Sequence, residues 1–206
     1  MTKLNNAQNE VIANYSVALQ TSIAERAAYE KSANADNLNI QKTLKDLAND
    51  FSHEVVVKIM HAASVDANFI NRHTRKNKRF NVYSAQKVAN IARSAAKADT
   101  LNNYTRCIFL TALALTKANL SMTHADAQAS LCADLRADAS KSSLIYRYAR
   151  TVAANTADTQ SSSSINALQM FEVLRETRDD KNNVAYTLNL SAATTKKLAS
   201  ALSIAL

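Results

Sequence analysis

The residues best suited to chemistry in this chain are cations gathered at residues 72–79, Arg-His-Thr-Arg-Lys-Asn-Lys-Arg. This run carries five full charges in eight residues, from Arg72, Arg75, Lys76, Lys78 and Arg79, and Lys87 follows on the next expected helix. Guanidinium and ammonium groups at this density suit phosphate oxygens. The alternative is an exposed connection between two helices, whose charges only keep it soluble.

Side-chain pairs for acid–base catalysis are hard to find. His124 lies close to Asp126 in the sequence, and His53 is next to Glu54. Residues one or two apart on a helix do not face each other, so neither pair forms a working acid–base couple by itself. We therefore expect a protein that is not an enzyme and that uses no cofactor.

The two cysteines, Cys107 and Cys132, lie within apolar helical patterns and have no neighbouring cysteine in a CxxC arrangement. Such settings are typical of reduced, buried thiols and raise the thiol pKa. His53 and His61 lie eight residues apart, and no further ligands at zinc-like spacing accompany them. We expect no metal site.

The chain of 206 residues has no glycine, no proline and no tryptophan. Average usage would give about 14 Gly and about 10 Pro in this length. Phosphate loops, dinucleotide fingerprints and nucleophile elbows need glycine, so none of them can be present in standard form. Turns are instead expected at Asn and Asp, which tolerate the left-handed region. Such pairs occur at Asn5-Asn6, Asp36-Asn37, Asn102-Asn103, Asp179-Asp180 and Asn182-Asn183.

The net charge of +8 is unevenly distributed. Residues 1–50 sum to −1, residues 51–100 to +6, residues 101–150 to +3 and residues 151–206 to zero. A basic middle suggests an acidic partner such as nucleic acid, and a solvated basic face is the alternative. With no apolar signal core and no membrane-length apolar stretch, we expect a cytoplasmic location, or a virion location if a phage encodes the protein.

Apolar spacing predicts a mainly α-helical fold in two parts, residues 1–100 and residues 101–206. The first part begins with a helix over about residues 4–31, whose narrow apolar stripe suits self-association or packing on its own domain. A break at Asn34–Asn37 precedes a second long helical segment from Ile40 to Met60, and a helix over Ser84–Lys97 follows the basic run. The stretch Leu101–Leu120 is apolar on nearly every side and is expected to be the central buried helix.

The most informative pattern lies at residues 121–190. Helices are expected from Ser121 or Thr123 to about Leu135, from Ser140 or Ser142 to Val152, and from Asp158 or Thr159 to Phe171. The third helix would turn Ile165, Leu168 and Phe171 inward and present Gln160, Ser163, Asn166 and Gln169 on its opposite face. Short hydroxyl and amide side chains of this kind read base edges in the major groove of DNA.

A β-hairpin is expected next, with strands around Phe171–Thr177 and Val184–Leu190 and its turn at Arg178–Asn183. Helix, helix, helix, hairpin, helix is the element order of the winged helix-turn-helix family, which residues 120–202 resemble. The resemblance implies a recognition helix at Gln160–Gln169 and phosphate contacts from Arg175, Arg178 and Lys181 on the wing. Arg147 and Arg150, on the preceding expected helix, would add positive charge near the groove. The glycine often found before the wing is missing here.

The leading hypothesis is a DNA-binding protein of phage or mobile-element type, with a C-terminal winged helix and a basic loop. The alternative is a helical structural or assembly protein, such as a virion component or adaptor, that forms homo-oligomers through residues 4–31. No membrane partner is expected.

Overall fold

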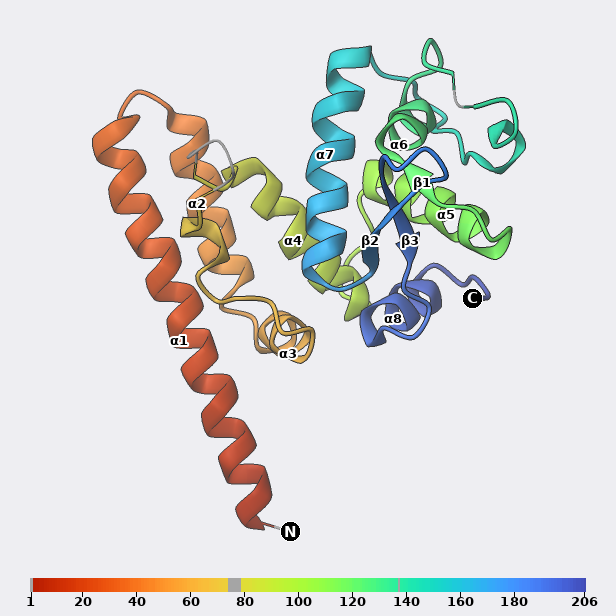
Figure 1. Cartoon of the computed structure of the whole chain (residues 1–206). Helices are drawn as coiled ribbons and strands as arrows, with labels where there is room; N and C mark the ends of the chain where they lie inside the picture. Colours follow the sequence, from red (N-terminus) through yellow and green to blue (C-terminus); the bar gives the residue numbers. More distant parts are fainter. Residues whose placement is uncertain (1, 74–78, 137) are drawn as a thin grey trace. The chain divides into compact units, whose positions relative to one another are not determined.

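The computed structural model describes residues 2–73, 79–136 and 138–206, and for residues 2–5 it describes the backbone alone. The chain divides into two compact units, residues 1–99 and residues 100–206 (Figure 1). Within the described ranges, no helix combines the length and the apolar character needed to cross a bilayer.

The first unit is built from helices. They are α1 (Thr2–Ala33), α2 (Leu38–Asp50), α3 (Glu54–Ala62), the 3-10 turn η1 (Phe69–Asn71) and α4 (Val82–Ala95). The break expected at Asn34–Asn37 is confirmed, because the side chain of Asn37 accepts a hydrogen bond from the Ile40 N–H and caps α2. The single long helix expected from Ile40 to Met60 is wrong. Its chain turns after Asp50, where the Ser52 hydroxyl donates to the Asn49 carbonyl at 2.7 Å.

Among the described side chains of α1, the buried ones lie in the second half of the helix. Leu19 and Ile23 are buried, and so are Arg26 and Glu30, whose side chains form an ion pair at 2.7 Å. The Arg26 guanidinium also donates to the Ile70 carbonyl, so the buried charge has both an ion-pair partner and a backbone acceptor. Residues 6–11 of α1 are exposed, and Figure 1 shows this end of the helix extending beyond the rest of its unit.

The second unit combines helices with a small sheet. Its elements are α5 (Asn103–Lys117), β1 (Met122–Thr123), α6 (His124–Leu131), the 3-10 turn η2 (Ser142–Leu144), α7 (Ala154–Met170), β2 (Leu174–Arg178), β3 (Val184–Leu188) and α8 (Ala193–Ala201). The central helix expected at Leu101–Leu120 is confirmed as α5, which buries Ile108, Phe109 and Leu115. The fold is therefore mainly helical, with one small antiparallel sheet in the described part.

The middle of the second unit differs from expectation. The helix expected to run to about Leu135 stops at Leu131, and the helix expected from Ser140 or Ser142 to Val152 is wrong. There, residues 145–152 follow α6 in an extended course. The Tyr148 N–H donates to the Ser130 carbonyl at 2.8 Å and the Val152 N–H to the Leu131 carbonyl at 3.1 Å. These bonds satisfy backbone donors that a helix would have used internally.

The expected hairpin is confirmed. Strands β2 and β3 pair antiparallel from Leu174 opposite Leu188 to Arg178 opposite Val184, and β1 adds a third strand on the other side of β3. The turn falls at residues 179–183, as expected. Asn182 adopts φ 61°, and an Asp179 carboxylate oxygen accepts from the Asn183 N–H at 2.7 Å.

The other residues with positive φ lie mostly at positions where the sequence has no Asn or Asp to predict a turn. Five helices end on a residue with positive φ one position beyond the cap: Ser64, Lys97, Asn119, Glu172 and Ser203. In each case this residue and the next donate backward to helix carbonyls, as the Glu172 N–H does to Gln169 and the Val173 N–H to Leu168. The expectation that Asn and Asp would supply the turns is therefore wrong for four of these ends. The pair Asn5-Asn6 lies inside α1.

Candidate nucleic-acid interface

Helix α7 is held in the second unit by its apolar and small residues. Ile165, Leu168 and Phe171 are buried as predicted, and the Ser164 hydroxyl lies 3.1 Å from the Thr105 hydroxyl of α5. The helix begins at Ala154, earlier than the expected start at Asp158 or Thr159. Packing on α5 and α6 fixes its axis within the unit.

The polar face expected on α7 is only partly exposed. Asn166 is exposed, Gln160 and Gln169 are half-buried, and Ser163 is 9% exposed. The expectation for Ser163 is wrong, because its hydroxyl lies against its own helix and donates to the Gln160 carbonyl at 3.1 Å. Asn166 therefore offers the most accessible amide on the second half of the helix.

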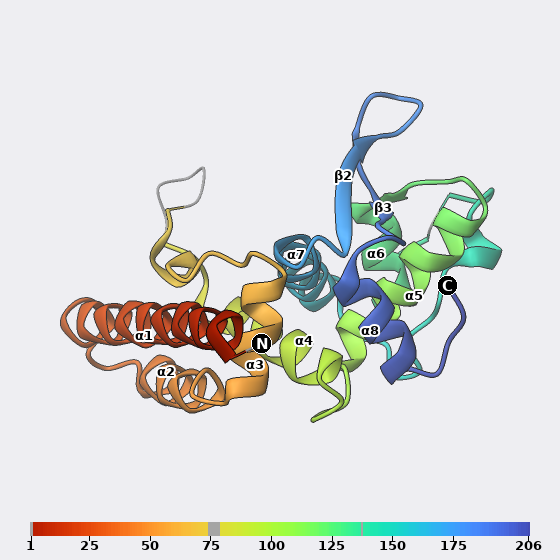
Figure 2. The same ribbon diagram turned by 90° about the horizontal axis from the view of Figure 1, so that it is seen from below.

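The hairpin carries the cations expected of a wing. Arg175, Arg178 and Lys181 are all exposed, and Figure 2 shows the hairpin projecting from the other elements of its unit. Arg178 donates to the Asn182 carbonyl at 3.3 Å and so stays beside the turn. Hydrogen bonds within the turn, first from the Asn183 N–H, lower the pKa of the Asp179 carboxyl. That carboxylate is occupied by the turn itself.

The basic run is described only at its ends, because Arg75, Lys76 and Lys78 lie outside the described residues. The Arg72 guanidinium lies 5.2 Å from the centre of the Phe80 ring, and the Arg79 guanidinium lies 3.8 Å from the Tyr29 ring. Such cation–π contacts hold the two arginines without neutralising their charge.

Lys87 does not occupy the exposed position expected for it. The residue is 8% exposed on the broad buried face of α4, and burial lowers the pKa of its ammonium group to about 8. The apolar neighbours Val88 and Ile91 are buried on the same helix. The expectation that Lys87 lies on the solvent side of this helix is therefore wrong.

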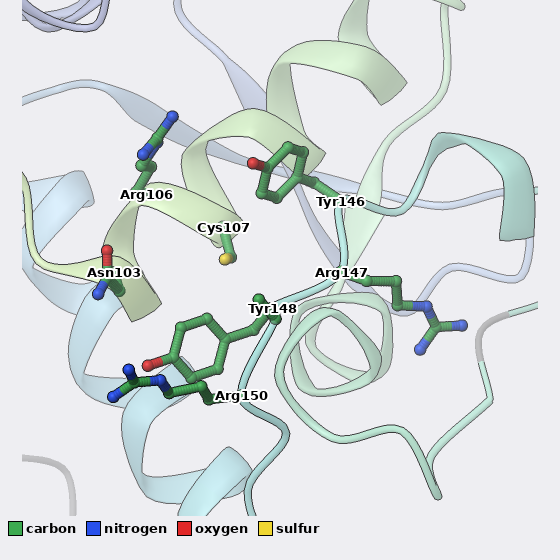
Figure 3. A pocket seen from close by; sticks show the side chains of 8 residues that line it. Asn103, Arg106, Cys107, Tyr146, Arg147, Tyr148 and Arg150 are labelled. Atoms are coloured by element: carbon green, nitrogen blue, oxygen red, sulfur yellow. The ribbon is translucent and has the colours of Figure 1, made fainter.

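Arg147 and Arg150 lie on the extended segment before α7, not on the helix expected there. The Arg147 guanidinium donates to the carbonyls of Ala129 and Leu135 near the end of α6. Together with Arg106 of α5, the two arginines line a pocket of about 360 Å³ that the sequence reading missed (Figure 3). No signal in the spacing connects Arg106 with residues forty positions later.

A serine, histidine and aspartate group that sequence reasoning also missed joins α6 to α7. The His124 Nε2 atom lies 3.0 Å from the Ser161 hydroxyl, 3.1 Å from the Ser162 hydroxyl and 3.9 Å from the Asp158 carboxylate. In a catalytic triad the aspartate holds the other ring nitrogen. The Ser161 hydroxyl also lies 3.0 Å from the Asp158 carbonyl, and when it donates to that carbonyl it accepts from His124, which is not the arrangement of a triad. These contacts connect α6 to α7.

No group of three His, Cys, Asp or Glu side chains in the described ranges is arranged to hold a metal ion. Comparisons of the chain with protein-family models, with curated proteins and with solved structures find no significant match.

Proposed function

We propose that the second unit is a winged helix-turn-helix domain that binds duplex DNA. The observation that carries the proposal is the order α5, α6, α7, hairpin β2–β3, α8, with β1 tying the hairpin to the start of α6. This matches the helix, helix, helix, hairpin, helix order of that family when α5 is taken as the first helix, because the helix expected from Ser140 or Ser142 to Val152 is absent. A fold-level likeness alone leaves the chemistry open, so the side chains must support the role.

Three groups of residues support DNA binding. Arg175, Arg178 and Lys181 on the projecting hairpin suit backbone phosphates, which fix register without reading sequence. Asn166 on α7 suits an adenine edge, because its amide both donates and accepts in a bidentate contact. The basic run at residues 72–79 adds sequence-independent attraction to the polyanion.

A matched pair of double variants of the full chain tests the proposal. Arg178→Ala with Lys181→Ala removes two hairpin cations, and Lys196→Ala with Lys197→Ala removes two exposed cations from α8, which follows the opposite end of β3. Fluorescence anisotropy with a labelled random-sequence duplex at low salt should show about tenfold weaker binding for the hairpin variant. The α8 variant should bind within about twofold of the unaltered protein. No duplex binding by the unaltered protein would refute the proposal.

A second candidate function is homo-oligomeric assembly through α1. Val11 and Val17 are 50% and 65% exposed on the first half of this helix. Exposed apolar residues on a long helix suit pairing with another helix. Sedimentation analysis without nucleic acid should then show a defined oligomer that Val11→Glu dissociates. A monomeric unaltered protein would exclude this role.

A further inference from the structure

A pocket in the second unit combines arginine and tyrosine side chains from two segments far apart in the sequence. Asn103 and Arg106 come from the first turns of α5, and Tyr146, Tyr148 and Arg150 come from the extended segment before α7. Figure 3 shows the two tyrosines on different sides of Cys107, with the Arg150 guanidinium beside Tyr148 and the Arg106 guanidinium pointing away from it, on the other side of Asn103. Its volume of about 360 Å³ lies in the range of small-molecule sites.

The walls of this pocket are held in place by the backbone. The Tyr146 N–H donates to the Thr111 hydroxyl of α5 at 3.0 Å, and the Tyr148 N–H donates to the Ser130 carbonyl of α6. The Tyr148 ring packs edge to face against Tyr104, with centroids 5.2 Å apart. A site whose walls are fixed before binding loses less entropy when a ligand enters.

The charge of the pocket is positive and unopposed. Its lining has three arginines and no carboxylate. The Arg147 guanidinium donates to carbonyls of α6 and of the loop after it, and Figure 3 shows this side chain turned away from the tyrosines. Arg106 and Arg150 form no ion pair within the part of the chain that the structure describes. Their fork-shaped donor sets match phosphate oxygens.

The aromatic walls indicate what accompanies the phosphate. Tyr146 is 44% exposed, so its ring is accessible to a planar group. Nucleobases stack on tyrosine in a sequence-tolerant way, and Asn103 adds an exposed amide for polar atoms of a sugar or base. Burial raises the pKa of the Cys107 thiol to about 11. At neutral pH the thiol is therefore protonated, and it lines the pocket as an uncharged group and not as a nucleophile.

We propose that this pocket binds a nucleoside phosphate, with the positive charge of Arg106 and Arg150 attracting the phosphate and the base stacked on Tyr146. The ligand is a free nucleotide or the 5′-phosphorylated end of a single strand, which share this chemistry. The lining has no residue in common with α7 or the hairpin, so the inference does not rest on the proposed duplex binding.

Calorimetric titration of the full chain tests the pocket, with adenosine 5′-monophosphate, adenosine and inorganic phosphate as separate probes. The monophosphate should bind tighter than either fragment. Arg106→Ala with Arg150→Ala should weaken its binding at least about tenfold, since the positive charge that attracts the phosphate is lost. Tyr146→Ala should weaken binding about fivefold or more, and Tyr146→Phe should keep it within about twofold, because stacking needs the ring and not the hydroxyl.

Three controls make the test decisive. The α8 variant, Lys196→Ala with Lys197→Ala, loses the same charge and should bind the monophosphate normally. The hairpin variant, Arg178→Ala with Lys181→Ala, should also keep this binding, so a failure of the duplex proposal is seen separately. Circular dichroism melting checks that each variant folds. No monophosphate binding by the unaltered protein, or equal binding by a folded Arg106/Arg150 variant, would overturn the inference.

Competition separates the two sources of the ligand. Displacement of the monophosphate by a short 5′-phosphorylated single-stranded oligonucleotide would assign the pocket to a strand end. Failure of that oligonucleotide to compete would assign it to a free nucleotide.

Discussion

Met122 of β1 lies opposite Tyr186 of β3, and through this pair the residues just before α6 are tied to the hairpin that follows α7. Met122 is fully buried, and the Thr123 side chain next to it accepts from the Asp126 N–H to begin α6. Asp126 returns the bond by accepting from the Thr123 N–H at 2.8 Å, which completes a capping box. The pairing therefore positions α6 and the hairpin together.

Truncation of Met122 should loosen this junction. We expect Met122→Ala to lower the free energy of unfolding by about 2–4 kcal/mol, because a buried side chain is replaced by a cavity. Val184→Ala is the matched control on the same sheet, since Val184 is exposed at the tip of β3 and should cost less than about 1 kcal/mol. Urea denaturation followed by circular dichroism measures both. Equal losses would show that β1 contributes no packing to the sheet.

Glycine placed at a left-handed helix end should stabilise this glycine-free protein. Glu172 has φ 55° just beyond α7, and a side chain with a Cβ adopts that conformation at a cost of about 1 kcal/mol. Glu172→Gly should therefore raise the free energy of unfolding by about 0.5–1 kcal/mol. Glu172→Ala removes the carboxylate but keeps the Cβ, so it should give no such gain. Asn119→Gly should gain less than Glu172→Gly, because Asn tolerates this region.

Lys87 should make stability depend on pH. Its pKa is lowered to about 8 in the folded protein from 10.5, so between these values the unfolded chain binds more protons than the folded one. Stability from this group should rise with pH across that window, by up to about 1.4 kcal/mol per pH unit. Lys87→Met removes the titrating group, so its free energy of unfolding should exceed that of the unaltered protein by less at pH 9.5 than at pH 7.5. Urea denaturation at the two pH values measures this difference. Lys196→Met, at an exposed site, should show no change with pH.

Asn166 should affect base preference more than affinity. Sequences selected from a random duplex pool by the unaltered protein should show a preferred base that Asn166→Ala no longer requires. Affinity for an unselected duplex should stay within about twofold, because phosphate contacts supply that binding. Ser163→Ala is the matched control on the same helix and should leave the selected sequence unchanged, since its hydroxyl bonds its own backbone. The same selected sequences from both variants would remove Asn166 from the interface.

The long helices and the hairpin could be predicted from the sequence, because their apolar residues have a clear period. The apolar spacing predicted α1 and α5, and alternating residues with an Asp/Asn turn predicted the hairpin. Strand β1 has only two residues, too few for any period to show. The segment from Leu144 to Val152 has helical spacing, yet the N–H groups of Tyr148 and Val152 bond to α6, and a pattern of side chains does not reveal such partners.

The exposure of candidate site residues could be predicted where it depends on residues close in the sequence. Turn chemistry placed the cations of the hairpin correctly on the surface. Lys87 and Ser163 were misplaced, because the width of a helix's buried face depends on tertiary neighbours that periodicity does not specify. Arg106 and Arg150 line the same pocket because of the course of the loop before α7, so residue spacing could not indicate it.

The salt dependence of duplex binding tests the central claim most directly. A plot of the logarithm of the binding constant against that of the potassium chloride concentration has a slope of about −0.9 for each phosphate contact. If the hairpin cations contact phosphate, Arg178→Ala with Lys181→Ala should make the slope shallower by nearly two units. The α8 variant, Lys196→Ala with Lys197→Ala, should keep the slope of the unaltered protein. Parallel plots for the unaltered protein and the hairpin variant would contradict the assignment of the hairpin as a DNA-contacting wing.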